Sequence, residues 1–568
     1  MSSHPRLPIA LLVDRLDDEY QVAVVRGALA AARELGVTLL CVPGGRVRDE
    51  DADGAARNVA FELVNAETVS AVVAVTSVIG SARGPAELRG WLERFGGLPL
   101  CCVGVPIRDR VTIEVDNSSG IRELVLHLAM DHGRRRIAFV RGPAASAEAR
   151  VRFQAYRDAL EEAGLPYDPR LVVAGDFLKP SGSAAVRALL EDERLSDRID
   201  ALVAANDYMA LGAMQEIGRR HREVPRDLAV VGFDDVDSAR LAHPALTTAR
   251  QPTEQLGRRG VETAFGLAEG RSPLSASLPT ELVLRQSCGC STVKAAFTNS
   301  IRPLAGDVEA CFAEQRHVIL AEVARAAAGH LDAAATGWEV PLVDGLIGEL
   351  SHQNGRSFHR TLEQLLQKFD QAPVNGAVLQ EVLSALRSQS LPCVAGVPRV
   401  RDRLEDLLHE ARVGVSAFCE EAAERRARAA RERQRNFERA MRSALLADTA
   451  RRSRAAAETL PELGVEACVV AALERPNDAS GQARVLFGFN ARDRITEATL
   501  IPFDRLPAHP MLEQSRRLVV VLPLVAFGHA LGAALVTTTG VGDDALEHVR
   551  EFLGTELDLL RRAGERAG

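Results

Sequence analysis

Two apolar runs that end in polar side chains decide the fold: residues 201–207 are ALVAAND and residues 228–235 are LAVVGFDD. Near-continuous apolar runs of this length are typical of strands covered on both faces of a parallel sheet. A helix is predicted between them. Ligands of open α/β sheets bind outside the carboxyl ends of the strands. We therefore expect polar groups at these two strand ends to face a small molecule.

The alternation of strand and helix extends over residues 8–290. Amphipathic stretches such as 20–35 and 122–132 separate the apolar runs. Further predicted strands are Pro8–Val13, Val37–Val42, Ser70–Val75, Leu98–Val103 and Arg136–Val140. This order predicts a doubly wound α/β architecture. Because about 280 residues exceed one such lobe, we expect two lobes with a cleft between them.

Composition excludes several classes of protein. The chain has 568 residues, and its 69 basic against 77 acidic residues leave a net charge of −8, so no general attraction to nucleic acid is expected. No apolar run reaches the roughly 18–20 residues of a membrane helix. The N-terminus also lacks the features of a secretory signal. We expect a cytoplasmic protein without membrane contact.

The nine cysteines mostly lie in apolar surroundings, as Cys41 and Cys468 do, and are expected to be reduced core thiols. Apart from the adjacent Cys101 and Cys102, Cys288-Gly289-Cys290 is the only close pair. It has no second pair and no histidine at zinc-site spacing beside it. The sequence therefore predicts neither a metal ion nor a cofactor.

Beyond residue 290 the pattern changes twice. Residues 291–456 are predicted to be helical, and 457–568 to form a smaller α+β domain of antiparallel strands with flanking helices. Within the helical segment a coiled-coil-like seam is formed by Leu404, Leu408, Ala411, Val415, Phe418 and Ala422. We expect this helix to pair with a second copy of itself or with neighbouring helices.

The two strand ends belong to a longer set of motifs: Val115-Asp116-Asn117, Arg152 with Tyr156-Arg157-Asp158, and Gly175-Asp176-Phe177. In order and spacing, residues 8–290 resemble the effector-binding core of the lactose-repressor/galactose-repressor (LacI/GalR) family. The resemblance implies two lobes like those of type I periplasmic binding proteins. Such lobes close on a sugar, polyol or nucleobase-like effector.

The resemblance also implies a set of ligand-binding side chains. Arg152 would grip hydroxyls or a carboxylate, Asn206 and Asp234 would hold hydroxyls, and Phe177 would stack on the ligand. Asp207 and Asp235 are expected to cap or orient. On spacing alone, Asn206 and the aspartates could equally be helix caps. With two residues of the first lobe, the predicted set is Arg152, Phe177, Asn206, Asp234, Asp14 and Tyr20.

Four features depart from the family or extend it. Gly104 stands where many members carry an aspartate, which removes one hydroxyl acceptor. Ile9 already begins the first strand, where family regulators carry a helix-turn-helix, so we expect no operator binding by that module. The arginines of 425–442 alternate with glutamates and indicate a solvated helix face rather than a DNA contact. Residues 457–568 weakly resemble GAF-like signalling domains.

The sequence thus predicts a non-enzymatic sensor in signal transduction or transcription regulation. Lobe closure on a sugar-like effector would pass through a dimeric helical segment to a partner output protein. One alternative is a LacI-type regulator that contacts DNA through an unrecognised element; another is a fragment of a sensor kinase or cyclase. No cyclase signature, kinase nucleotide motif or phosphate-binding loop occurs in the chain to favour an enzyme.

Overall fold

The computed structural model describes residues 7–80, 84–192, 199–290, 307–327, 337–351, 357–369, 376–445, 447–512, 518–540 and 545–567. Residue contacts divide the chain into two compact units. One unit comprises Met1–Ser291 together with Arg433–Gly568, and the other is Thr292–Glu432. The predicted boundary at residue 456 therefore lies inside the first unit.

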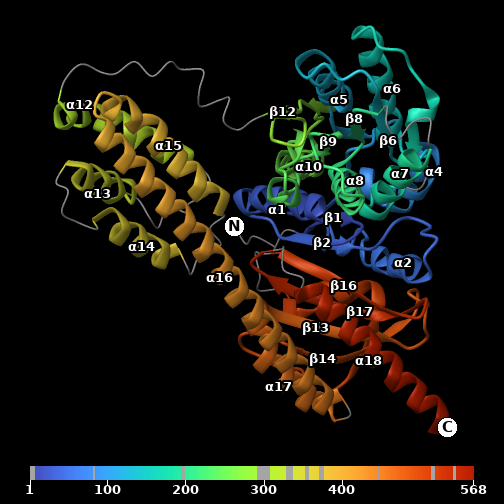
Figure 1. Ribbon diagram of the computed structural model, residues 1–568. Coiled ribbons are helices and arrows are strands. Elements are labelled where there is room, and N and C mark those ends of the chain that lie inside the picture. Colours follow the sequence, from blue (N-terminus) through green and yellow to red (C-terminus); the bar gives the residue numbers. More distant parts are fainter. Residues whose placement is uncertain are drawn as a thin grey trace. The chain divides into compact units, whose positions relative to one another are not determined.

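The first lobe is built on six parallel strands in the order β11-β5-β4-β3-β1-β2. Helices α1 (Glu19–Leu35) and α10 (Thr253–Ala268) pack side by side on this sheet (Figure 1). Its strands are β1 (Ile9–Val13), β2 (Leu39–Pro43), β3 (Ala71–Val75), β4 (Leu100–Val103), β5 (Val111–Val115) and β11 (Ala276–Leu278). Every strand end predicted in this lobe lies within two residues of the observed one.

The second lobe has six strands in the order β12-β10-β9-β8-β6-β7, of which only β12 is antiparallel. They are β6 (Ile137–Arg141), β7 (Val172–Ala174), β8 (Ala201–Ala204), β9 (Ala229–Asp234), β10 (Thr247–Arg250) and β12 (Glu281–Val283). Its helices are α5 (Asn117–Leu126), α6 (Ala147–Glu162), α7 (Lys179–Glu191) and α8 (Asp207–Arg219). The chain passes between the lobes after β5, after β10 and after β11, as two hinged lobes require.

Glycines let helices touch in each lobe. A Cβ on Gly27 of α1 would lie 1.8 Å from the carbonyl oxygen of Glu254, and one on Gly257 of α10 would lie 1.9 Å from that of Val24. In the second lobe, a Cβ on Gly182 of α7 would lie 2.0 Å from the carbonyl oxygen of Met209. No larger residue fits these positions unless the helices move apart.

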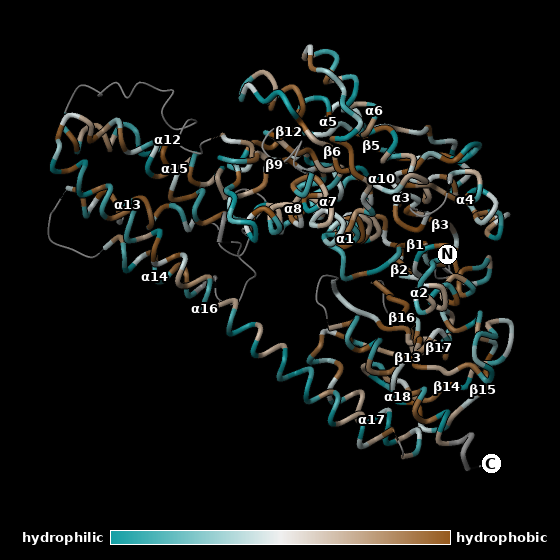
Figure 2. Tube along the Cα trace, turned by 45° about the vertical axis from the view of Figure 1, so that its right-hand side comes forward, coloured by the Kyte–Doolittle hydropathy of each residue, from teal (hydrophilic) through white to brown (hydrophobic). Residues whose placement is uncertain are grey.

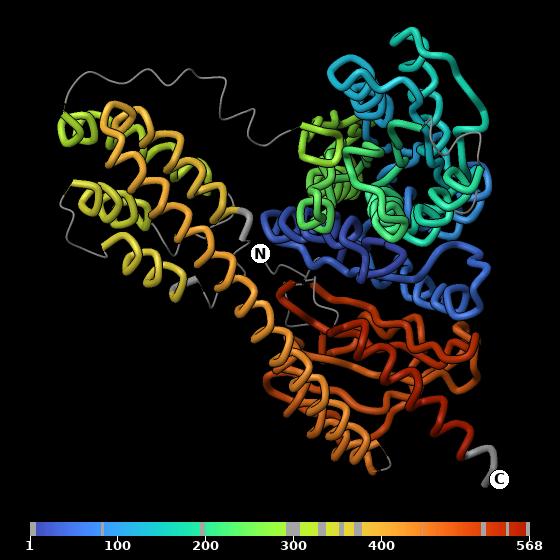
Figure 3. Tube along the Cα trace, viewed as in Figure 1, coloured from blue at the N-terminus to red at the C-terminus, as the bar shows by residue number. Residues whose placement is uncertain are grey.

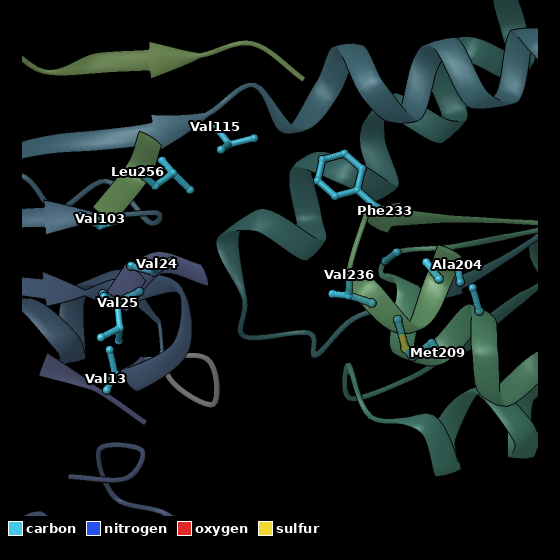
Figure 4. Packing of buried hydrophobic residues seen from close by; sticks show 14 of the residues in the cluster. Val13, Val24, Val25, Val103, Val115, Ala204, Met209, Phe233, Val236 and Leu256 are labelled. Atoms are coloured by element: carbon cyan, nitrogen blue, oxygen red, sulfur yellow. The ribbon is translucent and has the colours of Figure 1, made fainter. Parts of the chain in front are cut away.

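Apolar side chains fill the space around each sheet. Figure 4 shows Val13, Val25 and Leu256 packed in the first lobe and Phe233 and Met209 in the second. In Figure 2 the strands are mainly brown, whereas much of the long helix α16 is teal. The apolar runs that predicted the strands therefore form the core.

Residues 447–567 add a five-stranded antiparallel arrangement in the order β16-β17-β13-β14-β15. Its strands are β13 (Val465–Leu473), β14 (Gln482–Phe489), β15 (Thr499–Pro502), β16 (Leu518–Ala526) and β17 (His529–Thr538), with α17 (Thr449–Thr459) and α18 (Ala545–Ala567) beside them. The apolar runs 464–473, 482–489, 517–524 and 532–537 predict four of these strands. β15 was missed because it is a short, mostly exposed edge strand without an apolar pattern.

The sheet of the first lobe and the strands β13–β17 form one continuous sheet. β16 pairs in parallel with β2, so that Leu518 lies opposite Leu39 and Val520 opposite Cys41. The result is an eleven-stranded sheet in which the first and last parts of the chain adjoin, as the blue and red segments do in Figure 3. Apolar clusters cover the junction on both faces. The predicted third domain therefore shares its sheet and core with the first lobe.

Residues 292–432 form a helical unit with α12 (Val308–Ala326), α13 (Glu339–Ser351), α14 (Ser357–Phe369), α15 (Gly376–Val394) and the greater part of α16 (Pro398–Leu445). The seam residues Leu404, Leu408, Ala411 and Val415 are buried against these neighbouring helices of the same chain. Cys311 and Cys393 form a disulfide here, so the prediction of reduced thiols throughout is wrong for this pair. Among the described residues, no helix is both long and apolar enough to span a membrane.

Candidate functional site

A cavity lies between the two lobes, with a volume of about 760 Å³ when its open mouth is included. All six residues of the predicted set line it: Arg152, Phe177, Asn206, Asp234, Asp14 and Tyr20. They come from different elements that meet only in the fold. Three of them follow or end the strands β1, β8 and β9, and Phe177 follows β7. The carboxyl ends of parallel strands thus bring distant parts of the sequence to one place.

Arg152 is the central cation of the cavity and is only 3% exposed. Its Nε donates to Asn117 Oδ1 at 2.8 Å, and its Nη1 donates to the Ala205 carbonyl at 2.7 Å. The guanidinium also lies over the Phe233 ring, 3.9 Å from the centroid. These contacts hold the planar group in one orientation, which reduces the entropy it would lose on binding a ligand.

Two buried carboxyl groups lie beside this arginine. Asp234 Oδ1 is 3.8 Å from Arg152 Nη1 and accepts a hydrogen bond from Gln251 Nε2 at 2.5 Å. Burial raises the pKa of Asp234 well above its ordinary value, although Arg152 opposes the shift. Burial likewise raises the pKa of Glu148, again against Arg152. Arg152 therefore faces two buried carboxyl groups, and donor groups from a ligand would stabilise their charged forms.

Asn206 lines the cavity, but the chain uses both ends of its amide. Its Oδ1 accepts from the Met209 N–H at 3.0 Å and so caps helix α8, while its Nδ2 donates to the Phe177 carbonyl at 3.0 Å. Of the two possibilities left open by the spacing, the helix cap is the one observed. Asn206 therefore acts on the site through Phe177 and α8 as well as by its position.

Phe177 has a φ of 71°, in the left-handed region that few non-glycine residues adopt. Its ring packs against Gly142, where a Cβ would come within 2.3 Å of the ring. The Arg152 guanidinium lies 5.9 Å from the ring centroid. Asn206 and Gly142 thus hold an aromatic face at the edge of the polar cavity. Their contacts offset the free-energy cost of the strained backbone at Phe177.

Asp207 and Asp235 brace the second lobe, as expected. Asp207 is fully buried and accepts hydrogen bonds from Thr248 Oγ1 at 2.7 Å and from the Val236 N–H at 3.1 Å. Asp235 pairs with Arg250 at 2.7 Å and with Arg285 at 2.6 Å. These bonds fix the loop after β9, which carries Asp234.

The first lobe contributes Asp14 and Tyr20. Burial raises the pKa of Asp14, and the nearby arginines, Arg15 and Arg46, oppose the shift. The Tyr20 hydroxyl lies 3.4 Å from Ser77 Oγ, and burial raises its pKa. Gly104 shows why no aspartate stands after β4: its φ is 97°, and a Cβ would lie 2.5 Å from the Cβ of Ser77. Ser77 occupies that part of the wall.

Sequence reasoning missed several cavity residues because it followed only strand ends and family motifs. Glu148 lies in the first turn of α6, after the cap Ser146. Gln251 comes directly after β10, and Tyr208 follows Asp207 within the run that decided the fold. The position of Gln251 after a strand was a usable signal. The position of Glu148 gave no usable signal, since a glutamate near a helix start is usually explained by the helix dipole.

Contacts also cross the mouth between the lobes. The Ser238 N–H of the second lobe donates to Glu19 Oε2 of the first lobe at 2.9 Å. The Glu19 N–H donates to the Tyr208 hydroxyl at 3.0 Å. These bonds hold α1 against the second lobe and are available only when the two lobes are close together.

Comparison with known proteins agrees with this architecture. Residues 126–288 match the family described as "Periplasmic binding protein-like domain". The HTH-type transcriptional regulator CelR of Thermobifida fusca is 40% identical over 195 residues, which are 34% of this chain and 55% of that protein. The HTH-type transcriptional repressor CytR of Escherichia coli (strain K12) is 33% identical over 178 residues, or 31% of this chain and 51% of that protein.

A solved structure described as a transcriptional regulator CelR-cellobiose complex is 30% identical, with a TM-score of 0.43, and the match covers 50% of this chain and 86% of that one. The chain spans about half the length of the curated relatives it matches. The matched segment is a periplasmic-binding-protein-like domain of the kind found in LacI family regulators. These relatives are regulators of transcription rather than enzymes.

Proposed function

We propose that this protein regulates transcription in response to a small polyhydroxylated effector, a sugar or sugar-like molecule, which binds between the two lobes. The relatives are transcriptional regulators, and one solved relative is described as a cellobiose complex. Both support this class of function. The composition of the cavity supports the class of ligand.

One observation carries the proposal: buried carboxyl groups converge with a held guanidinium and an aromatic face. Asp234 and Glu148 accept hydrogen bonds, Arg152 donates them, and Phe177 provides a flat apolar surface. A sugar ring has hydroxyls that both donate and accept along its edge, and C–H groups on its faces. A sugar would donate hydrogen bonds to the carboxyl groups and pack one face on the Phe177 ring at the same time.

Effector binding would favour the closed arrangement of the lobes. Contacts to Arg152 and Asp234 from one side and to Asp14 and Tyr20 from the other would add to the Glu19 contacts across the mouth. The shift is limited to the difference in effector affinity between the open and closed states. Because β16 pairs with β2, closure would move the second lobe relative to the first lobe and the β13–β17 strands together.

The effector cavity can be tested by thermal denaturation of the full chain with sugars, polyols, nucleobases and small acids. A cognate effector should raise the midpoint, and Asp234→Asn should abolish this rise, because an unpaired buried contact costs about 1–3 kcal/mol. Asp158→Asn is the matched control, since Asp158 is exposed on α6 and bonds only Gln154 among the described residues. Equal effector stabilisation in Asp234→Asn would contradict the proposed site.

For the output, we favour control of transcription by direct DNA contact of this chain as a homodimer, because the relatives are named HTH-type transcriptional regulators and repressors. Relay through the helical unit to a partner protein is the second candidate. Helix α16 supports it, because this helix begins in the helical unit and ends in the unit that contains the lobes. Retention of the full chain on duplex DNA at low salt, decreasing steeply as salt rises, would support direct contact. No retention at low salt, with or without effector, would assign the output to a partner.

A further inference from the structure

A second cluster of reactive side chains lies in the second lobe, apart from the effector cavity. It consists of His127, His132, Cys288 and Cys290, whose ligand atoms all lie within 4.8 Å of one another. None of the four lines the cavity. The two histidines come from the helical turn directly after α5, and the two cysteines from the segment after β12. The LacI-type function proposed above makes no use of them.

The contacts within the cluster resemble the edges of a metal-centred tetrahedron. With Zn–N bonds of about 2.0–2.1 Å and Zn–S bonds of about 2.3 Å, a tetrahedral site has N···N edges of about 3.3 Å and N···S edges of about 3.6 Å. His127 Nε2 lies 3.1 Å from His132 Nε2. Cys290 Sγ lies 3.5 Å from His127 Nε2 and 3.4 Å from His132 Nε2. A small expansion would admit an ion among them.

The surrounding groups orient the ligand atoms as metal sites require. Asp131 Oδ2 lies 2.7 Å from His127 Nδ1, so the carboxylate fixes the ring and leaves Nε2 toward the cluster. Thr247 Oγ1 donates to Cys288 Sγ at 3.1 Å, and the Cys290 N–H donates to the same sulfur at 3.4 Å. Hydrogen bonds of this kind stabilise a metal-bound thiolate.

Gly289 permits the two cysteines to face the histidines. Its φ is 110°, which side-chain-bearing residues rarely adopt, and a Cβ there would lie 3.2 Å from His132 Nδ1. The backbone between the cysteines therefore passes directly against a histidine ring. Both the positive φ and the close approach to the His132 ring therefore require glycine at position 289.

We propose that His127, His132, Cys288 and Cys290 bind one Zn²⁺ ion as a structural site. Two thiolates with two imidazoles in a tetrahedral arrangement favour zinc, and four protein ligands leave no position open for catalysis. The ion would fasten residues 288–290, where the chain leaves the second lobe, to the end of helix α5. The histidines that the sequence lacks at zinc-site spacing beside Cys288 are supplied by the fold, which brings His127 and His132 to the two cysteines.

The first test measures the metal content of the full chain, purified under reducing conditions without chelator. We expect one equivalent of zinc per chain. Replacement of the ion by Co²⁺ should give the visible d–d bands of a tetrahedral site and a thiolate-to-cobalt charge-transfer band. No zinc and no such bands would overturn the proposal, as would a different metal at one equivalent or a Cys288–Cys290 disulfide in the isolated protein.

Variants locate the site. Cys290→Ser and His132→Gln should reduce the zinc content to background, whereas Cys419→Ser, which removes a partly exposed thiol from the helical unit, should leave it unchanged. Full zinc content in both site variants would overturn the assignment.

If a variant does not fold, the wild-type chain still tests the site. A mercurial reagent should release one zinc per chain as the thiols react, and a chromophoric chelator detects the released ion. Release without thiol reaction would contradict cysteine ligation.

Discussion

Arg152 shows how the surroundings of single residues set the chemistry of the effector cavity. Its guanidinium is held by Asn117, the Ala205 carbonyl and the Phe233 ring, yet it faces two buried carboxyl groups. Burial raises the pKa of Asp234 and Glu148 even though Gln251 donates to Asp234 and Arg152 lies near both. A carboxylate can accept several hydrogen bonds, so a ligand with hydroxyl donors would stabilise the charged forms.

Asp18 also lines the cavity and allows the cost of burying a carboxylate there to be measured without an effector. Burial is the main cause that raises its pKa to about 6, although the Gln21 N–H donates to it and Arg15 lies near. A carboxyl group whose pKa is higher in the folded state destabilises the fold when it is charged. Its favourable contribution is present below the unfolded pKa of about 4 and is lost as the pH rises through about 6.

Asp18→Asn should therefore stabilise the chain at pH 7.5, by on the order of 1 kcal/mol after solvent screening, and have little effect near pH 4. Asparagine caps a helix as well as aspartate does, so the cap of α1 is kept. Midpoints of thermal denaturation measured across this range check the prediction. Asp51→Asn, at the exposed cap of α2 (Ala52–Ala56), is the control. The prediction would be wrong if the midpoints of wild type and Asp18→Asn differed by the same amount at every pH.

At the scale of elements, the close contact of α7 with α8 positions the cavity wall. Helix α8 begins at the strand end that carries Asn206, and the loop before α7 carries Phe177. Gly182 and Gly212 bring the two backbones together, because a Cβ on Gly212 would lie 2.0 Å from the Lys179 carbonyl oxygen. The distance between these helices therefore sets the distance between Phe177 and the strand ends.

Gly182→Ala should destabilise the protein by about 1–3 kcal/mol, since the new methyl group would meet the Met209 backbone. Gly218→Ala, on α8 itself, is the matched control, because a Cβ there meets nothing within 4 Å. That change should be neutral or stabilising by up to about 1 kcal/mol. Urea denaturation measures both, and effects of the same sign and size would show that the helices do not constrain each other.

For the whole molecule, the pairing of β2 with β16 has the largest consequence. In a separate sensor domain β2 would be the exposed edge of a sheet. Here the edge is covered, and Leu40, Val519 and their neighbours form an apolar cluster across the junction. Arg57 of the first lobe also pairs with Glu547 of α18 at 3.1 Å. The strands β13–β17 thus extend the first lobe.

A chain shortened to residues 1–290 should therefore expose an apolar strand edge and self-associate, because unpaired backbone groups and apolar side chains on β2 would be open to a second molecule. Size-exclusion chromatography with light scattering compares it with the full chain at equal concentration. The shortened chain should also unfold at a lower temperature. A monodisperse species with the size and midpoint of an independent domain would contradict the shared core.

Local patterns in the sequence predicted most of the strands, because buried parallel strands are apolar runs, and also the polar strand ends at Asn206 and Asp234. Arg152 and Phe177 were predicted from the family resemblance, because no local pattern marks them. Spacing left the role of Asn206 open, and the fold showed it to be a helix cap. Glu148 could not be found, since a glutamate in a first helical turn has an ordinary local explanation. β15 escaped because an exposed edge strand has no apolar period.

Properties that depend on pairing distant segments were decided only in three dimensions. Nothing in residues 39–41 or 518–520 specifies that these two apolar strands adjoin, since any buried strand has similar side chains. In the same way His127 and Cys290 are 163 residues apart, and no spacing rule connects them. Side-chain periodicity along the sequence determines individual helices and strands. Contacts between distant segments depend instead on how these elements pack, and packing is a property of the whole chain.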